Sequence, residues 1–187
     1  MPNPIAYLAL AIWPIVALAL YGRLRADQAL IWTILVGYLF LPELPAAFDL
    51  PLMPPLNKHN IPALAAFAIA LWRYGYDGPL LPQNPLGKLL LLTFIFSPVL
   101  TVLNNNEPVF FGQVGLPGLA TKDALALIVQ QFLLVLPFLL ARQFLASGGA
   151  QRELLKALVI GGLVYSVLML IEIRLSPQLN LWIYGYY

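Results

Sequence analysis

The sequence contains no cysteine and a single histidine. The absence of cysteine excludes disulfide bonds, thiolate metal sites and a cysteine nucleophile. Because His59 stands alone, we do not expect a zinc site built from histidines of this chain. The sequence therefore predicts a protein with no metal and no other cofactor.

Charged side chains are also scarce. Only 10% of the 187 residues are charged, 61% are hydrophobic and the mean hydropathy is +0.83, whereas soluble domains carry about 25% charged residues. So few charges cannot cover a surface that faces water, and the composition predicts an all-α polytopic membrane protein. The net charge of +2 and the absence of a basic cluster give no indication of nucleic-acid binding.

Six apolar segments are long enough, or nearly long enough, to span a bilayer. They cover residues 5–21, 29–48, 61–74, 86–103, 124–140 and 154–173. The third is short and could be tilted or re-entrant. Pro14, Pro98 and Pro137 lie inside three of the others and predict kinked helices, because proline removes a backbone hydrogen bond. We expect one transmembrane domain over residues 1–187, a bundle of about six helices.

The basic residues predict how these segments are oriented. Seven of the ten Lys and Arg residues lie in or beside the first, third and fifth loops: Arg23, Arg25, Arg73, Lys88, Arg142, Arg152 and Lys156. The positive-inside rule places these loops in the cytoplasm and both termini outside. Since no basic residue precedes Arg23, we expect the first segment to be a retained helix and not a cleavable signal peptide.

Polar residues within the apolar segments have two possible interpretations. Thr93, Ser97, Thr101 and Asn105 are four residues apart and share one helix face. They indicate either hydrogen bonding between helices, which we favour, or a groove for a polar substrate group.

Two other features indicate helix packing. Gln130 and Gln131 lie in mid-span, so at least one should face the protein. Gly162 and Ser166 form a small-xxx-small pair that would let a second helix approach closely.

The predicted outer loops and the end of the sixth segment hold the remaining polar chemistry. Asparagines with aromatic side chains are ordinary turn residues, but they also suit sugar binding. Glu172 and Arg174 are two residues apart and should point to opposite sides of a helix. Arg174 either snorkels to the interface or binds phosphate oxygens. The candidate substrate-binding residues are Arg174, Glu172, Lys122, His59, Lys58 and Asn105. No catalytic motif is present, so no catalytic residue is assigned.

Several short motifs together resemble a known family. They are LPELP at residues 41–45, LNKHNIP at 56–62, NNNEP at 104–108, GLPGL at 115–119 and IEIRLSPQL at 171–179, followed by Trp182, Tyr184, Gly185 and Tyr186. In this combination the chain resembles the N-terminal part of the bacterial O-antigen ligase and polysaccharide polymerase superfamily. The likeness covers most of the chain.

The resemblance implies a fold of about a dozen membrane helices without a metal. Such enzymes transfer a glycan from a polyprenyl diphosphate carrier to an acceptor at the outer face of the inner membrane. Arginines hold the diphosphate and a base activates the acceptor. This chain has about half the expected helices and lacks the large outer loop with the family's arginines and histidine, so no catalytic residue carries over. We expect the site to lie mostly beyond residue 187, because the chain ends where that loop would begin.

The leading hypothesis is therefore the membrane-scaffold part of a lipid-linked polysaccharide polymerase or O-antigen ligase in the bacterial inner membrane. Its expected partners are membrane lipid, a polyprenyl-diphosphate-linked oligosaccharide, and either other membrane subunits or a missing C-terminal half. The alternative is a small non-enzymatic integral-membrane subunit that packs against a larger complex. A transporter is less favoured, because mid-depth charges for ion coupling are lacking.

The predicted orientation can be tested with topology reporters. A reporter inserted at residue 148 is expected to be cytoplasmic and one at residue 112 external, because the basic loops stay inside. Paired enzymatic reporters that are active on only one side of the membrane measure both. An external signal from position 148 would show that the predicted orientation is wrong.

Overall fold

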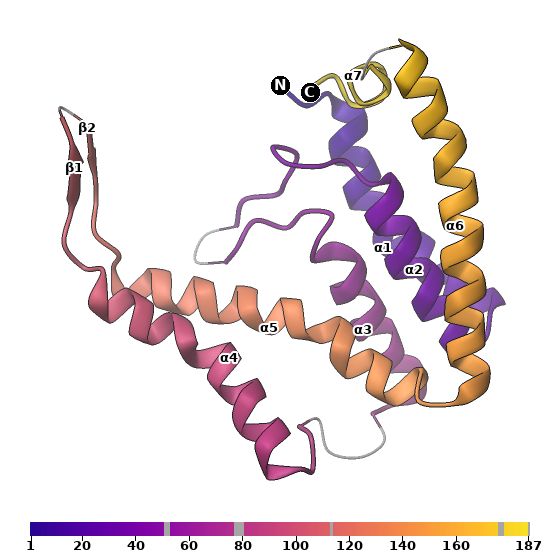
Figure 1. Ribbon diagram of the computed structural model, residues 1–187, viewed down its shortest axis with the longest axis horizontal. Helices are drawn as coiled ribbons and strands as arrows, with labels where there is room; N and C mark the ends of the chain where they lie inside the picture. The colour runs from indigo at the N-terminus through magenta and orange to yellow at the C-terminus, as the bar shows by residue number, and fades with distance from the viewer. Residues whose placement is uncertain (51–52, 77–80, 113, 176–177, 187) are drawn as a thin grey trace. The chain divides into compact units, whose positions relative to one another are not determined.

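The chain is mostly helical. A computed structural model describes residues 1–50, 53–76, 81–112, 114–175 and 178–186. Within them the helices are α1 (Pro4–Arg23), α2 (Ala26–Phe40), α3 (Ile61–Tyr74), α4 (Pro85–Asn104), α5 (Thr121–Phe144), α6 (Gly148–Leu175) and α7 (Leu179–Tyr184) (Figure 1). Strands β1 (Val109–Phe111) and β2 (Val114–Leu116) form an antiparallel hairpin between α4 and α5. This hairpin was not predicted from the sequence.

The six predicted segments coincide with α1 to α6, with one clear error. The second segment was predicted to run to residue 48, but α2 ends at Phe40 and Leu41 is already extended, with φ −73° and ψ 150°. The cause is Pro42, since proline disfavours a helical conformation of the residue before it. Glu43 therefore lies outside the helix.

Several of the helices suit a membrane. Among the described helices, α1, α4, α5 and α6 are long and apolar enough to cross a bilayer. The apolar helices α2 and α3 have only 15 and 14 residues. At 1.5 Å per residue such helices are about 22 Å long, less than the roughly 30 Å of a hydrocarbon core. The chain thus has the character of a helical membrane protein with four long apolar helices.

The chain packs as two compact units. Unit 1 comprises residues 1–48, 56–77 and 136–187, and unit 2 comprises residues 49–55 and 78–135. Helix α5 begins in unit 2 and ends in unit 1. The single domain expected from the sequence stays a prediction.

Helix α2 lies at the centre of unit 1, where it contacts α1, α3 and α6. It runs parallel to α6. At one end the Gln28 amide donates to Glu153, and at the other the rings of Phe40 and Tyr165 lie 6.3 Å apart edge to face. Between them, the backbone of Gly161 in α6 lies against Leu35 of α2.

Small side chains allow close approach in the core of unit 1. One buried cluster consists of Ala17, Tyr21, Ala29, Leu30, Ala65, Ala66, Ile69, Ala70 and Leu140. A second consists of Ala6, Leu10, Trp13, Leu41, Ala46, Ile61 and Tyr186. Alanine and glycine at these contacts bring helix backbones together, which is how membrane helices gain van der Waals energy.

The predicted Gly162–Ser166 packing pair is wrong. A Cβ atom added at Gly162 would meet no atom within 4 Å, whereas one added at Gly161 would lie 3.2 Å from Leu35 Cδ2. Neighbouring positions on a helix differ by about 100° in direction, so the packed face is one residue away. The Ser166 hydroxyl donates instead to the Leu163 carbonyl, at 2.7 Å.

Most of the cations of unit 1 gather at one end. The Tyr74 ring lies 6.3 Å from Tyr21 and 6.0 Å from Phe144, so α1, α3 and α5 end together, where α2 and α6 begin. We call this the basic end of unit 1; its helix termini and adjoining loops carry Arg23, Arg25, Arg73, Arg142, Arg152 and Lys156. Among the described residues, the acids there are Asp27 and Glu153. This grouping agrees with the sorting of loops expected from the sequence, while the side of the membrane stays a prediction.

In unit 2 the predicted polar stripe bonds to its own helix. The Ser97 hydroxyl donates to the Phe94 carbonyl at 3.0 Å, and the Asn105 amide donates to the Thr101 carbonyl at 2.8 Å. The side chains of Ser97 and Asn105 therefore bond within their own helix and not to another helix. Of the glutamine pair, Gln130 is exposed and Gln131 is half-buried, as expected if one faces the protein.

Helix packing around Gly37 gives a stability prediction. A Cβ atom at this position would lie 2.5 Å from Pro62 Cγ of α3, and the proline ring cannot rotate away. We expect Gly37→Ala to destabilise the protein by about 1–2 kcal/mol, because overpacking outweighs the gain in helix propensity. Thermal unfolding in detergent measures the effect. Gly162→Ala is the matched control and should be neutral or stabilising; equal melting temperatures for the two variants would contradict the packing.

Candidate functional site

A pocket of about 360 Å³ lies in unit 1 between the C-terminal parts of α2 and α6, the segments that follow α2, and α7. Its lining consists of Leu39, Phe40, Leu41, Glu43, Lys58, Tyr165, Leu168, Met169, Glu172, Leu179, Asn180, Ile183 and Tyr184. We call it the Glu43–Glu172 pocket. It lies at the opposite end of the α2–α6 pair from the basic end. Polar groups and an apolar wall share its surface.

The Glu43 carboxylate contacts two side chains that are cationic or can become so. Its carboxylate oxygens lie 2.5 Å from Lys58 Nζ and 2.7 Å from His59 Nε2. The loop that carries these residues is held by its own asparagines: Asn57 Oδ1 accepts from the His59 backbone N–H, and Asn60 Oδ1 accepts from that of Asn57, both at 2.9 Å. Such side-chain turns favour a defined loop, so both donors are aimed at one carboxylate.

The ion pairs determine the charge state of Glu43. Partial burial raises the pKa of its carboxyl group, but hydrogen bonds from Lys58 and His59 lower it more, so that the pKa lies below its ordinary value. Glu43 is thus ionised at neutral pH. Lys58 Nζ is correspondingly neutralised by a carboxylate in direct contact.

Helix α7 is fastened to the end of α2. The Tyr184 hydroxyl donates to the Phe40 carbonyl and the Tyr186 hydroxyl to the Glu43 carbonyl. The Asn180 amide donates to the Tyr186 carbonyl at 2.7 Å. The last carbonyls of a helix lack partners within it, and Tyr184 supplies one here. Burial and the nearby charge of Glu43 raise the pKa of Tyr186 to about 12, so its hydroxyl stays a donor.

The N-terminus completes this support. The Asn3 backbone N–H donates to the Tyr184 carbonyl and the Asn3 amide donates to the Ile183 carbonyl, both at 2.9 Å. Gly185 has φ +81° and its α-carbon faces Asn3, so a side chain there would be both strained and crowded. The polar wall formed by α7 is therefore held from two sides.

Glu172 is a polar group of the pocket with spare hydrogen-bonding capacity. Its side chain is half-buried and lines the pocket, yet it forms no hydrogen bond or ion pair among the described residues. An ionised carboxylate accepts several hydrogen bonds. With Glu43 and Lys58 forming a neutral pair, Glu172 gives the lining a net negative charge.

The structure brings together part of the predicted site. Lys58 and Glu172 line one pocket, and His59 is linked to it through Glu43. Arg174 is exposed in the last turn of α6 and is not among the lining residues. No ion pair joins Arg174 to Glu172 within the described part of the chain, as the spacing predicted.

The two other predicted residues belong to unit 2. Asn105 bonds to the preceding turn of α4, and its carbonyl accepts from the Leu119 N–H at 2.9 Å. Lys122 is exposed at the start of α5. Two residues of the motif at 171–179, at positions 176 and 177, lie outside the described residues, as do residues 51 and 52 of the proline-rich loop.

Sequence reasoning missed Glu43, Tyr165 and the roles of Tyr184 and Tyr186. Glu43 was placed inside a membrane segment, although Pro42 and Pro45 on either side of it were a signal that the helix ends earlier. Tyr184 and Tyr186 entered the sequence analysis only as part of the family motif. Nothing in their spacing indicates that their hydroxyl groups reach residues 40 and 43.

Comparisons with protein-family models, with curated proteins and with solved structures find no match for this chain.

The ion pairs of Glu43 with Lys58 and His59 predict a pH-dependent contribution to stability. Because folding lowers the pKa of Glu43, the stabilisation is present above the ordinary glutamate pKa and is lost as the pH falls through the lowered value. Since these side chains are partly exposed, we expect at most about 1 kcal/mol per pair. The melting temperature of Glu43→Gln should be below that of the wild type at pH 7, and the difference should shrink towards pH 3.5.

Glu107→Gln is the control for this measurement. Glu107 is exposed and forms no ion pair among the described residues, so its replacement should leave the pH profile unchanged. A Glu43→Gln difference that is the same at both pH values would show that the loss comes from packing and not from ionisation.

Proposed function

We propose that the chain is the membrane-scaffold part of a lipid-linked polysaccharide polymerase or O-antigen ligase, and that the Glu43–Glu172 pocket binds the glycan portion of the carrier-linked substrate. The observation that carries the proposal is the half-buried Glu172 carboxylate without a partner in the described part of the chain, in a pocket that also offers tyrosine rings and an amide. Carboxylate and amide oxygens accept hydrogen bonds from sugar hydroxyl groups. Tyr165 and Tyr184 offer apolar ring surface to the C–H groups of a sugar.

The charge of the lining favours a neutral sugar over a diphosphate. Glu43 neutralises Lys58, and Glu172 adds a negative charge that would repel phosphate oxygens. Arg174, the cation expected to meet the diphosphate, is outside the lining. The diphosphate of the substrate is accordingly assigned to groups other than those of this pocket.

The apolar wall suits the lipid part of the substrate. Leu168 and Met169 of α6 line the pocket, and further along α6 the large apolar side chains Val164, Val167 and Leu170 are exposed, as on a helix that faces lipid. A polyprenyl chain in the bilayer could lie along α6 while its sugar enters the pocket. In this proposal all six helices α1 to α6 cross the membrane, α2 and α3 being held within unit 1 by their neighbours, and the pocket opens at the outer face of a bacterial inner membrane.

Binding of synthetic carriers tests the proposal. The purified protein in nanodiscs is titrated with a short-chain polyprenyl diphosphate bearing an oligosaccharide and with the same diphosphate without sugar. We expect the glycan to increase the affinity. Glu172→Gln should weaken binding of the glycosylated carrier about tenfold, because a hydrogen bond to a charged group contributes about 1.5 kcal/mol or more. It should leave binding of the bare diphosphate unchanged.

Glu107→Gln is the matched control and should bind both carriers as the wild type does, because Glu107 is an exposed acid of unit 2 outside the pocket lining. Equal affinities of the wild-type protein for the two carriers would contradict the proposal that the pocket binds the glycan. If neither carrier binds while the protein co-purifies in a stoichiometric complex, the chain is instead a non-enzymatic subunit.

A further inference from the structure

A second cavity lies towards the basic end of unit 1, between the N-terminal halves of α2 and α6. It has a volume of about 210 Å³ and is lined by Gln28, Ile31, Trp32, Glu153, Lys156, Ala157 and Ile160. We call it the Gln28–Lys156 groove. Its residues are polar towards the start of each helix and apolar further in.

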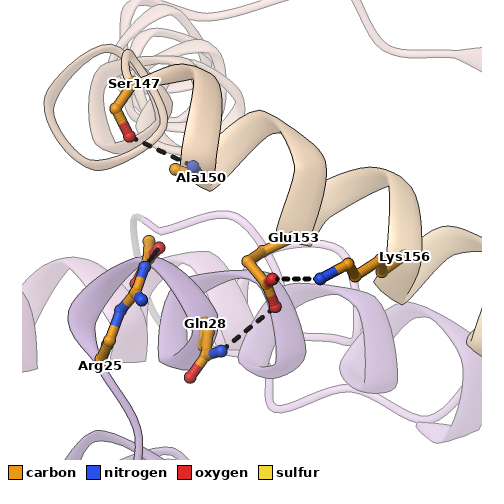
Figure 2. A network of polar contacts seen from close by, with 7 residues as sticks. Arg25, Gln28, Ser147, Ala150, Glu153 and Lys156 are labelled. Carbon is orange, nitrogen blue, oxygen red and sulfur yellow. Dashed lines mark hydrogen bonds and ion pairs between the residues drawn. The ribbon is translucent and has the colours of Figure 1, made fainter.

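A small polar network forms the mouth of the groove (Figure 2). Glu153 accepts a hydrogen bond from the Gln28 amide on Oε2, at 3.2 Å, and one from Lys156 Nζ on Oε1, at 2.8 Å (Figure 2). At the start of α6 the Ser147 hydroxyl accepts from the Ala150 N–H at 3.2 Å. The network thus fixes α2 against α6 and holds the Lys156 ammonium group beside the groove.

Within the described residues, the acids beside this groove leave donors of Arg152 and Lys156 unused. Arg25 is paired with Asp27 at 2.5 Å, and Glu153 takes one donor of Lys156, which has three. Arg152 is exposed, and within the described residues it forms no hydrogen bond or ion pair. Residues four apart on a helix are neighbours on its surface, so Arg152 and Lys156 present two cations on one face of α6. Like charges at this spacing repel, and an anion between them would remove the repulsion.

We propose that the Gln28–Lys156 groove binds an anionic phospholipid of the bilayer. Arg152 lies one turn before Lys156, beside the groove and outside its lining, and supplies the uncompensated charge that binds the phosphate of the headgroup with its guanidinium fork. Lys156, which is paired with Glu153, adds the donors that Glu153 does not use. Gln28 faces the glycerol region. One acyl chain lies on Ile31, Trp32 and Ile160, and the small side chain of Ala157 leaves the room for it. Basic pockets between membrane helices have the charge and shape that select acidic headgroups. The site is independent of the glycan pocket at the other end of α2.

Native mass spectrometry of the purified protein tests the site. The protein is released from mixed micelles with equal amounts of phosphatidylglycerol and phosphatidylcholine, and retained lipids are counted. We expect one phosphatidylglycerol to be retained in preference to phosphatidylcholine. The double variant Arg152→Ala/Lys156→Ala should lose this preference, with an affinity about fivefold lower for each cation removed. The matched control Arg73→Ala removes a cation from the same end of unit 1 outside the groove and should keep it.

Two further variants separate a lipid site from a simple phosphate site. Ile160→Trp keeps every charge but fills the apolar part of the groove, and Ile160 is 49% exposed, so folding should tolerate the change. It should lose the retained phosphatidylglycerol. Glu153→Gln keeps an acceptor for Gln28 and frees Lys156, so it should retain phosphatidylglycerol more tightly. Retention by Ile160→Trp equal to wild type, or by the double variant equal to Arg73→Ala, would overturn the proposal.

Discussion

The end of helix α2 at Phe40 is the constraint on which the candidate site depends. Pro42 disfavours a helical conformation for Leu41, and the chain leaves the helix before Glu43 and not after residue 48. The exit has two consequences. It exposes carbonyl groups of residues 40 and 43, which the hydroxyls of Tyr184 and Tyr186 satisfy. It also turns the Glu43 carboxylate towards Lys58 and His59, which would be impossible within a continuous helix in hydrocarbon.

The parallel pair α2 and α6 gives unit 1 two chemically different ends. At the basic end, cations exceed acids and a groove with Trp32 opens between the helices. At the other end, aromatic hydroxyls, an ion pair and Glu172 surround a larger pocket. Contact through Gly161 keeps the two helices close between these sites. The same pairing therefore produces both cavities, and its distribution of charge follows the asymmetry expected of a membrane helix bundle.

The helices were predictable because hydrophobicity and length alone identify a segment that suits a bilayer. The six apolar segments reappear as α1 to α6, with errors where local chemistry competes with hydropathy. Pro42 ended α2 early, and the stretch after residue 104 forms a hairpin whose short strands carry no clear alternation. The packing face of α6 was missed by one residue, because Gly161 and Gly162 are equivalent in composition and differ only in which neighbour they meet.

By itself the sequence determined the class of protein, the helical segments and the grouping of the cations, since these follow from composition and from charges counted along the chain. Only the tertiary structure decided which polar residues meet. Glu43, Lys58 and Glu172 come from three separate stretches of the chain and line one pocket. The hydroxyl groups of Tyr184 and Tyr186 reach the carbonyls of residues 40 and 43 only because of how the helices pack. Arg174 has the right chemistry for an anion but is not part of the pocket lining, because the step of two residues from Glu172 changes the direction of a helical side chain by about 200°.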